Sequence, residues 1–395
     1  MKLTKNVEYI LDTIEKAGAR ADIVGGPVRD HFLGYEPSDY DITTSATPEE
    51  VKEIFRAHRT VDTGIKHGTV SLILDGEQYE ITTYRVDGEY KDFRHPESVS
   101  FTTRIEDDLA RRDFTVNAMA YSKKYGLTDV FGGREDLKNG IIRAVGDPHA
   151  RFSEDALRIL RAIRFSSVLG FEIEKNTAQA ARELSHLLSR ISAERIYTEW
   201  TKLLSGKNAY AVISKYKDII AEVLPELEFS TLPDEKRFAS SAPDVRHLAL
   251  FASLANGAES FDTAMRRLRS STAVREDGAT VLASLGKYAL SNRSDVGLAL
   301  YELGNSRTAM LARLEFLLGG EDNSEEISAY LASGRAYRLS DLEISGTEVA
   351  KIGARGKEIG AILNTLMLDV IYERCENTKT DLISRAEDKL SALRG

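Results

Sequence analysis

The chain has 395 residues, of which 42% are hydrophobic and 29% are charged, and its net charge at pH 7 is −9. At about 150 residues per domain this length predicts two or three domains, and no apolar run approaches the roughly 18 residues of a membrane span. The acidic balance argues mildly against a nucleic-acid partner, and a single cysteine, Cys375, excludes an intrachain disulfide or a cysteine metal cage.

The first twenty residues predict an amphipathic helix. Val7, Ile10, Leu11 and Ile14 follow one another at helical spacing. The same stretch contains acidic residues and no small-residue cleavage site, so it lacks the pattern of a signal peptide. We therefore expect a protein of the reducing cytoplasm, without a membrane partner.

Strand signals are confined largely to the first 145 residues. The predicted strands are 21–24, 39–43, 69–74 and 78–84. An Asp-Gly pair after the third strand predicts a hairpin turn. From about Ser153 onward long helical periodicities take over. The sequence thus predicts an α/β head followed by an all-helical remainder, with a linker over 228–244.

The stretch VGGPVRDHFLG joins the first predicted strand to the second. Gly25 and Gly26 end the strand, and Pro27 suits the first turn of a helix, where its missing N–H has no partner to lose. Gly34 can end that helix in a left-handed conformation. A helix N-terminus lined by glycine N–H groups is an anion site suited to phosphate, and Arg29 can add a fixed positive charge.

Asp39 and Asp41 lie two residues apart on the next predicted strand, so their side chains should share a face and repel each other. Mg²⁺ commonly takes one or two carboxylates together with substrate phosphates. A phosphate cradle beside such a pair predicts nucleotidyl transfer, in which one metal activates the attacking hydroxyl and another steadies the pyrophosphate. Taken alone, an Asp-x-Asp is more often a solvated strand edge. Glu80, the candidate third carboxylate on a neighbouring strand, could equally be a solvent-facing glutamate.

Three further stretches sharpen this prediction: DTGIKHGTVSLIL (62–74), RRDFTVNAMAY (111–121) and GDPHARFSEDALRILRAIRF (146–165). With the glycine turn and the paired aspartates, they resemble the bacterial class II tRNA nucleotidyltransferases, the CCA-adding enzymes, whose relatives include poly(A) polymerases. The resemblance implies a polymerase-beta-like α/β nucleotidyltransferase head with a mixed sheet, followed by an all-α neck, body and tail. The implied ranges are 1–145 for the head, 146–208 for the neck, 209–312 for the body and 313–395 for the tRNA-binding tail.

The resemblance also implies an activity, the template-independent addition of C, C and A to the 3′ end of tRNA from CTP and ATP. It makes Asp39 and Asp41 the catalytic ligands of Mg²⁺. The nucleotide contacts that it implies are Gly26, Arg29, Arg112, Asp113, Asp155, Arg158, Arg161 and Arg164. Among them, Asp155 and Arg158 match the base-reading pair of the family.

The chemistry of Asp155 and Arg158 supports that role. Residues three or four apart on a helix lie on one face, which would place Asp155, Arg158 and Arg161 along one stripe. An ionised Asp only accepts hydrogen bonds and an Arg only donates them. Cytosine and adenine each offer an amino donor beside a ring acceptor, whereas uracil and guanine place a carbonyl oxygen where the amino group should be. A site strongly rejects a base that would leave its buried polar groups unpaired, so this pair of residues predicts that C and A are accepted and that U and G are rejected. Judged from spacing alone, an Asp and an Arg three residues apart more often form a surface salt bridge.

Arg266, Arg267 and Arg269 form a candidate patch for the RNA backbone, although a solvated charged face explains them equally well. Segment 85–101 resembles the loop that the family needs for the final A, and CC-adding relatives lack it. This favours full CCA addition. A-adding enzymes, CC-adding enzymes and poly(A) polymerases are the alternatives, and an inactive RNA-binding protein is a remote one. The sequence leaves the oligomeric state open, a homodimer included.

Overall fold

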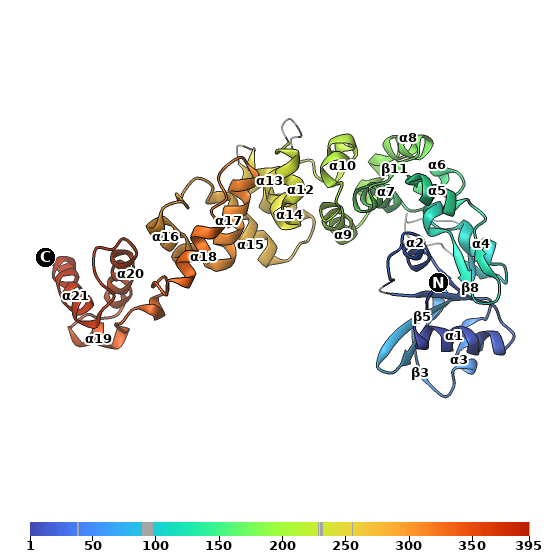
Figure 1. Ribbon diagram of the computed structural model, residues 1–395, viewed down its shortest axis with the longest axis horizontal. Helices are drawn as coiled ribbons and strands as arrows, with labels where there is room; N and C mark the ends of the chain where they lie inside the picture. Colours follow the sequence, from blue (N-terminus) through green and yellow to red (C-terminus); the bar gives the residue numbers. More distant parts are fainter. Residues whose placement is uncertain (38, 89–97, 228, 230–231, 255, 395) are drawn as a thin grey trace. The chain divides into compact units, whose positions relative to one another are not determined.

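The computed structural model describes residues 1–37, 39–88, 98–227, 229, 232–254 and 256–394, and the chain divides into two compact units, Met1–Pro225 and Glu226–Gly395 (Figure 1). The first unit holds a mixed seven-stranded sheet and the helices that follow it. The second unit is helical in its described residues. An α/β head followed by a helical remainder is therefore confirmed.

The sheet of the first unit has the strand order β3-β4-β5-β2-β1-β8-β9. Its strands are β1 (Ala21–Val24), β2 (Asp41–Thr44), β3 (Arg59–Gly64), β4 (Thr69–Leu74), β5 (Glu77–Thr83), β8 (Ala120–Ser122) and β9 (Gly126–Thr128). Strands β2 and β5 pair in parallel, and the other neighbours pair antiparallel. The expected strands 21–24 and 69–74 are confirmed residue for residue. The strand expected at Asp39 begins only at Asp41, because Asp39 lies in a bend before it.

Local turn chemistry accounts for the connections around this sheet. Asp75 and Gly76 both adopt positive φ angles, 51° and 83°, between paired Leu74 and Glu77, which is the two-residue hairpin that the sequence predicts. Gly34 follows the helix after the glycine turn with a φ of 81°, also as predicted.

Helices and short strand pairs complete the first unit. The helices are α1 (Lys5–Lys16), α2 (Gly26–Phe32), α3 (Pro48–Ile54), α4 (Ile105–Ala110), α5 (Gly133–Asn139), α6 (Pro148–Glu154), α7 (Leu157–Leu169), α8 (Lys175–Glu183), α9 (Ala193–Leu204), α10 (Ala209–Lys215) and α11 (Lys217–Val223). The additional strands are β6 (Arg85–Asp87), β7 (Val99–Phe101), β10 (Ile141–Ile142) and β11 (Glu172–Ile173). All four apolar residues expected on one face of α1 are fully buried. Strands β6 and β7 pair with each other, and 89–97 of the predicted loop lie outside the described residues.

The helical pattern around residue 155 is interrupted. Asp155 has an extended backbone, with φ −140° and ψ 100°, between α6 and α7. Its side-chain Oδ1 accepts a hydrogen bond from the backbone N–H of Leu157 at 3.0 Å, as a capping residue does. The prediction that Asp155 shares a helical stripe with Arg158 and Arg161 is therefore wrong, because Asp155 precedes the helix that carries the two arginines.

The second unit contains ten α-helices and one 3-10 helix, η4 (Leu339–Asp341), in its described residues. The α-helices are α12 (Glu235–Ser240), α13 (Pro243–Ala252), α14 (Gly257–Arg267), α15 (Thr272–Ala283), α16 (Arg293–Leu303), α17 (Asn305–Leu317), α18 (Ser324–Ala332), α19 (Gly346–Lys351), α20 (Lys357–Ile371) and α21 (Lys379–Arg394). Helix α12 lies inside the predicted linker 228–244, so that part of the linker prediction is wrong. Asp234 caps α12, and Phe238 buries its ring. The division into head, neck, body and tail stays a prediction.

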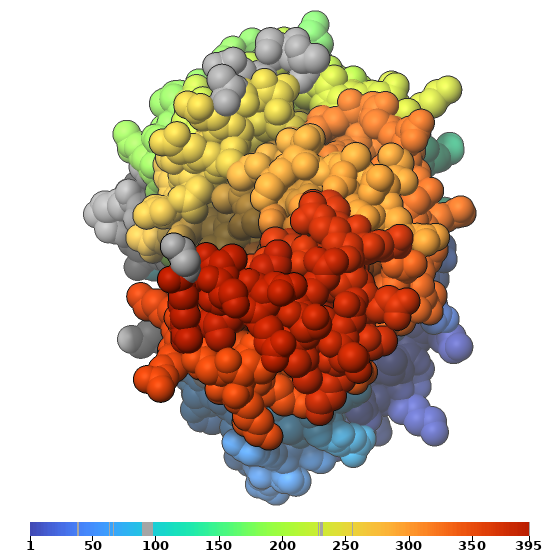
Figure 2. All heavy atoms as spheres, turned by 90° about the vertical axis from the view of Figure 1, so that its left-hand side faces the viewer, coloured from blue at the N-terminus to red at the C-terminus, as the bar shows by residue number. Residues whose placement is uncertain are grey.

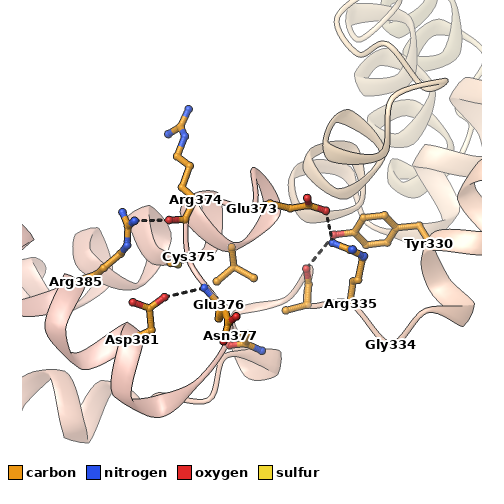
Figure 3. Close-up of a pocket in the computed structure, with 12 residues that line it drawn as sticks. Tyr330, Gly334, Arg335, Glu373, Arg374, Cys375, Glu376, Asn377, Asp381 and Arg385 are labelled. Atoms are coloured by element: carbon orange, nitrogen blue, oxygen red, sulfur yellow. Dashed lines mark hydrogen bonds and ion pairs between the residues drawn. The ribbon is translucent and has the colours of Figure 1, made fainter.

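The last helices of the chain gather on one face of the second unit, coloured red in Figure 2. Helices α19, α20 and α21 share a core that includes Val349, Ile362 and Leu382. Beside it lies a cavity of about 790 Å³, in which Arg335 pairs with Glu373 at 2.6 Å (Figure 3). Throughout the described residues, each helix is too short or too polar to cross a membrane.

Two glycine substitutions test this account of packing. A Cβ on Gly133 would lie 2.2 Å from the Thr115 carbonyl oxygen, whereas one on Gly360 would meet no atom within 4 Å. We expect Gly133→Ala to lower the free energy of unfolding by about 1–3 kcal/mol through overpacking. Gly360→Ala, at an exposed helical position close to the start of α20, should raise it by roughly 0.5–1 kcal/mol. Thermal unfolding measures both, and shifts of the same sign would contradict the packing described.

Candidate active site

The glycine turn brings an arginine and an aspartate close to the start of α2. Gly25 has a φ of 73° and a ψ of −130°, a conformation that side chains of L-residues rarely adopt. A Cβ there would lie 3.0 Å from Nη1 of Arg112 and 3.6 Å from Oδ2 of Asp41. The glycine therefore leaves the space into which these two side chains approach the turn. Arg29, one turn into the helix, places its Nη2 3.7 Å from the position of a Cβ on Gly26.

The three carboxylates predicted from the sequence share a cavity. Asp39, Asp41 and Glu80 all line one cavity of about 580 Å³. In the parallel pairing of β2 with β5, Ile42 faces Ile81, so Asp41 and Glu80 are neighbours one residue earlier on each strand. The bend at Asp39 does not separate it from Asp41, because both lie at the same cavity.

Electrostatics at this cavity favour a cation. Loss of hydration raises the pKa of Asp41 above its ordinary value, against the attraction of Arg112, and the charge of Asp39 raises it further. Carboxylate oxygens are ligands that a hard divalent cation prefers. In the ranges that the structure describes, the side chains are not drawn together into a set of three or more metal-ligating groups.

Buried Asp108 holds Arg111 and Arg112, the two arginines that precede Asp113 in the chain. Its Oδ1 lies 2.7 Å from Arg111, and its Oδ2 lies 3.3 Å from Arg112. Burial alone would raise the pKa of Asp108, but the two guanidinium groups outweigh it and hold the pKa below its ordinary value. Asp108 was not among the predicted site residues, although its spacing of four from Arg112 on a helical stretch is a signal that sequence reasoning could have used.

Asp113 links the segment around Asn117 to helix α7 through hydrogen bonds. One oxygen, Oδ2, accepts from Nε and Nη2 of Arg161 at 2.8 and 2.6 Å, and the other accepts from Asn117 at 3.1 Å. Burial would raise the pKa of Asp113, but Arg161 and Asn117 hold it below its ordinary value. Arg29 donates to the side-chain oxygen of the same Asn117 at 2.8 Å. Three predicted site residues, Arg29, Asp113 and Arg161, thus form one hydrogen-bonded group through Asn117.

Glu199, on α9, completes this group. Its carboxylate lies 2.6 Å from Arg164 and 3.8 Å from Arg161, and the residue is 6% exposed. The sequence offers no periodic signal for this pairing, because Glu199 lies on another helix.

Asp155 and Arg158 have other partners in this structure. Asp155 pairs with Arg195 at 2.8 Å. Arg158 pairs with Glu154 at 2.7 Å and donates to the carbonyl oxygen of Arg111 at 2.9 Å. Asp155 lies between α6 and α7, and Arg158 lies in the first turn of α7. The two predicted base-reading side chains are therefore held by different neighbours. Arg195 was not predicted.

The predicted RNA-backbone patch lies in the second unit, at the end of α14. Arg266 pairs with Asp262 at 2.7 Å, and Arg267 forms two hydrogen bonds with Glu226 at 2.9 and 2.7 Å. Arg269 is exposed and has a φ of 55°. The patch is exposed, and the partners of Arg266 and Arg267 are carboxylates.

Removing the Asp113 carboxylate tests the link to α7. Asp113→Asn should lower the free energy of unfolding by roughly 3 kcal/mol at pH 7, because Arg161 loses its buried partner. The folded-state pKa lies below the ordinary 3.8, so the stabilisation is fully present above pH 3.8 and is lost as pH falls through the folded-state value. Thermal unfolding between pH 7 and pH 3 measures the difference between variant and wild type.

A matched control is Asp218→Asn, which removes an exposed pair with Arg182 and should change stability by less than about 1 kcal/mol. Equal effects of the two substitutions, or an Asp113→Asn deficit that grows toward acid pH, would contradict the role of the buried pair.

Comparisons with known proteins identify the family. The family model "Poly A polymerase head domain" matches residues 21–143, and the model "Probable RNA and SrmB- binding site of polymerase A" matches residues 170–229. The chain is 37% identical over 386 residues to the CCA-adding enzyme of Lactobacillus helveticus, with 96% of each chain covered, and 34% identical to that of Enterococcus faecalis, with 99% of each covered. The crystal structure of the Bacillus stearothermophilus CCA-adding enzyme in complex with CTP matches with a TM-score of 0.83 and 28% identity, over 99% of both chains. The chain belongs to the family of the CCA-adding enzymes.

Proposed function

We propose that this protein adds C, C and A to the 3′ end of tRNA, without a template, from CTP and ATP. Its full-length relatives are named for CCA addition, and one of them was crystallised with CTP. The observation that carries the proposal is that Asp39, Asp41 and Glu80 line one cavity, and that Asp41 also approaches the turn that Gly25 opens for Arg112. Carboxylates next to a fixed guanidinium suit the transfer of a nucleotidyl group from a triphosphate.

Asp39 and Asp41 would hold Mg²⁺ in this cavity, with Glu80 as a further ligand or as a base beside them. The two aspartates repel each other, and a divalent cation between them would offset that repulsion. When bound, Mg²⁺ would activate the 3′-hydroxyl and stabilise the departing pyrophosphate. Arg29 and Arg112, together with the backbone at Gly26, orient the triphosphate so that its α-phosphate faces the hydroxyl.

Asp155 and Arg158 would read the base. A carboxylate has about four lone-pair sites, and Asp155 uses one on the N–H of Leu157 and another on Arg195. Arg158 has five N–H donors and directs its Nη atoms to Glu154 and to carbonyl oxygens. Acceptor capacity on Asp155 and donor capacity on Arg158 therefore remain for the amino group and ring acceptor of C or A. Arg161 and Arg164 would extend the same site, with Asp113 near the sugar.

Binding of tRNA would involve the helical second unit. Arg266, Arg267 and Arg269 are proposed contacts for the RNA backbone, and residues 313–395 are the proposed tRNA-binding tail. Two of these arginines would exchange their carboxylate partners for phosphate. We further propose a cytoplasmic location, for which the single cysteine of the chain is the support. A homodimer stays a prediction.

One experiment tests the activity and the metal ligands together. Wild-type protein, Asp39→Asn and Asp41→Asn are each incubated with Mg²⁺, all four nucleoside triphosphates and a tRNA trimmed of its last three nucleotides, and the products are sequenced. We expect the wild type to add CCA and stop. Each variant should lose at least about 10²-fold in rate, because a neutral amide is a poor ligand for a hard cation.

The products also separate the alternatives. Addition of A alone, of CC alone or of a long A tract would identify the A-adding, CC-adding or poly(A) polymerase activity instead. Undiminished extension by either variant would contradict the catalytic assignment. The matched control is Glu77→Gln, since Glu77 lines the same cavity without belonging to the proposed ligands.

A further inference from the structure

One aromatic ring in the first unit is surrounded by guanidinium groups. The Arg164 guanidinium carbon lies 3.8 Å from the centroid of the Phe165 ring, and those of Arg29 and Arg161 lie 5.3 and 5.4 Å from it. Phe165 is 5% exposed, and Phe114 contacts its ring in a T-shaped arrangement at 5.8 Å. Three positive charges from two separate elements, α2 and α7, therefore converge on one buried ring.

Carboxylates balance these charges but act at the edges of the guanidinium groups. Arg29 pairs with Asp30 at 2.7 Å, while the partners of Arg161 and Arg164 are Asp113 and Glu199, described above. An ion pair fixes which N–H groups are used, whereas an aromatic face attracts the flat side of a cation and so fixes its plane. The negative face of the ring is especially effective where water is excluded. Loss of hydration, opposed by Glu199, lowers the pKa of Arg164, in keeping with a poorly hydrated site.

We propose that Phe165 is a positioning residue for the nucleotide: its ring sets the planes of Arg29, Arg161 and Arg164 so that their remaining donors face one anionic ligand. Arg161 illustrates the geometry, because Nε and Nη2 bind Asp113 and leave Nη1 available toward the ligand and Glu199. The inference rests on the proposed function, in which these three arginines contact the nucleotide. Phe165 acts through them and does not touch the reacting atoms.

A series of fluorinated side chains tests this role with little change of shape. Phe165 is replaced by mono-, di- and trifluorophenylalanine in the full-length protein, since each fluorine weakens the negative face of the ring. The Kd for CTP is measured by calorimetry, and the melting temperature is recorded for each protein. We expect the Kd to rise stepwise, by about tenfold across the series, while the turnover rate at saturating CTP changes little.

The control is the same series at Phe152, a fully buried phenylalanine on α6, where no dependence of the Kd on fluorine is expected. A second pair, Phe165→Tyr and Phe165→Leu, separates ring from volume, because only the tyrosine keeps an aromatic face. A Kd that is constant across the Phe165 series, or equally raised in the Phe152 series, would overturn the inference. Failure of the wild type to extend tRNA would instead overturn the proposed function, so the two failures are distinguishable.

Discussion

Buried carboxylates that hold arginines are the constraint on which the first unit depends. Asp108, Asp113 and Glu199 are no more than 8% exposed, and each lies within ion-pair distance of two guanidinium groups or accepts two bonds from one. A buried carboxylate without its partner is strongly unfavourable, so each arginine also stabilises the fold. The cations of the site are thereby fixed before a ligand arrives, which is the condition for efficient electrostatic stabilisation.

The same balance of charges supports the proposal that Asp155 and Arg158 read the base in place of a nucleic-acid template. Asp155 is held by Arg195 and by the start of α7, and Arg158 is held by Glu154. Neither partner changes the character of the group, because a carboxylate only accepts and a guanidinium only donates. The pair therefore offers one hydrogen-bonding pattern, which suits an amino group beside a ring acceptor and opposes a carbonyl oxygen in the same place.

Sequence reasoning predicted the features that local rules decide. The hairpin turn at Asp75 and Gly76 and the left-handed Gly34 follow from turn chemistry alone. The break at Asp155 was missed because its spacing fits a helix equally well, and only the capping hydrogen bond reveals it. Glu199 was missed for a different reason: ion pairs between distant helices leave no period in the sequence. The candidate site was thus predictable in its residue types, while the partners that hold it required the fold.

The nucleotide choice of Asp155→Asn tests the central claim most directly. Asparagine keeps a side-chain oxygen for the cap of α7 but adds an amide donor, which can pair with the carbonyl oxygen of uracil. The measurement compares kcat/KM for CTP with that for UTP, on trimmed tRNA, in wild type and variant. The account predicts that the preference for CTP falls by at least about tenfold in Asp155→Asn, while the lost ion pair with Arg195 lowers the melting temperature without itself altering the preference. An unchanged preference for CTP would contradict base reading by this carboxylate.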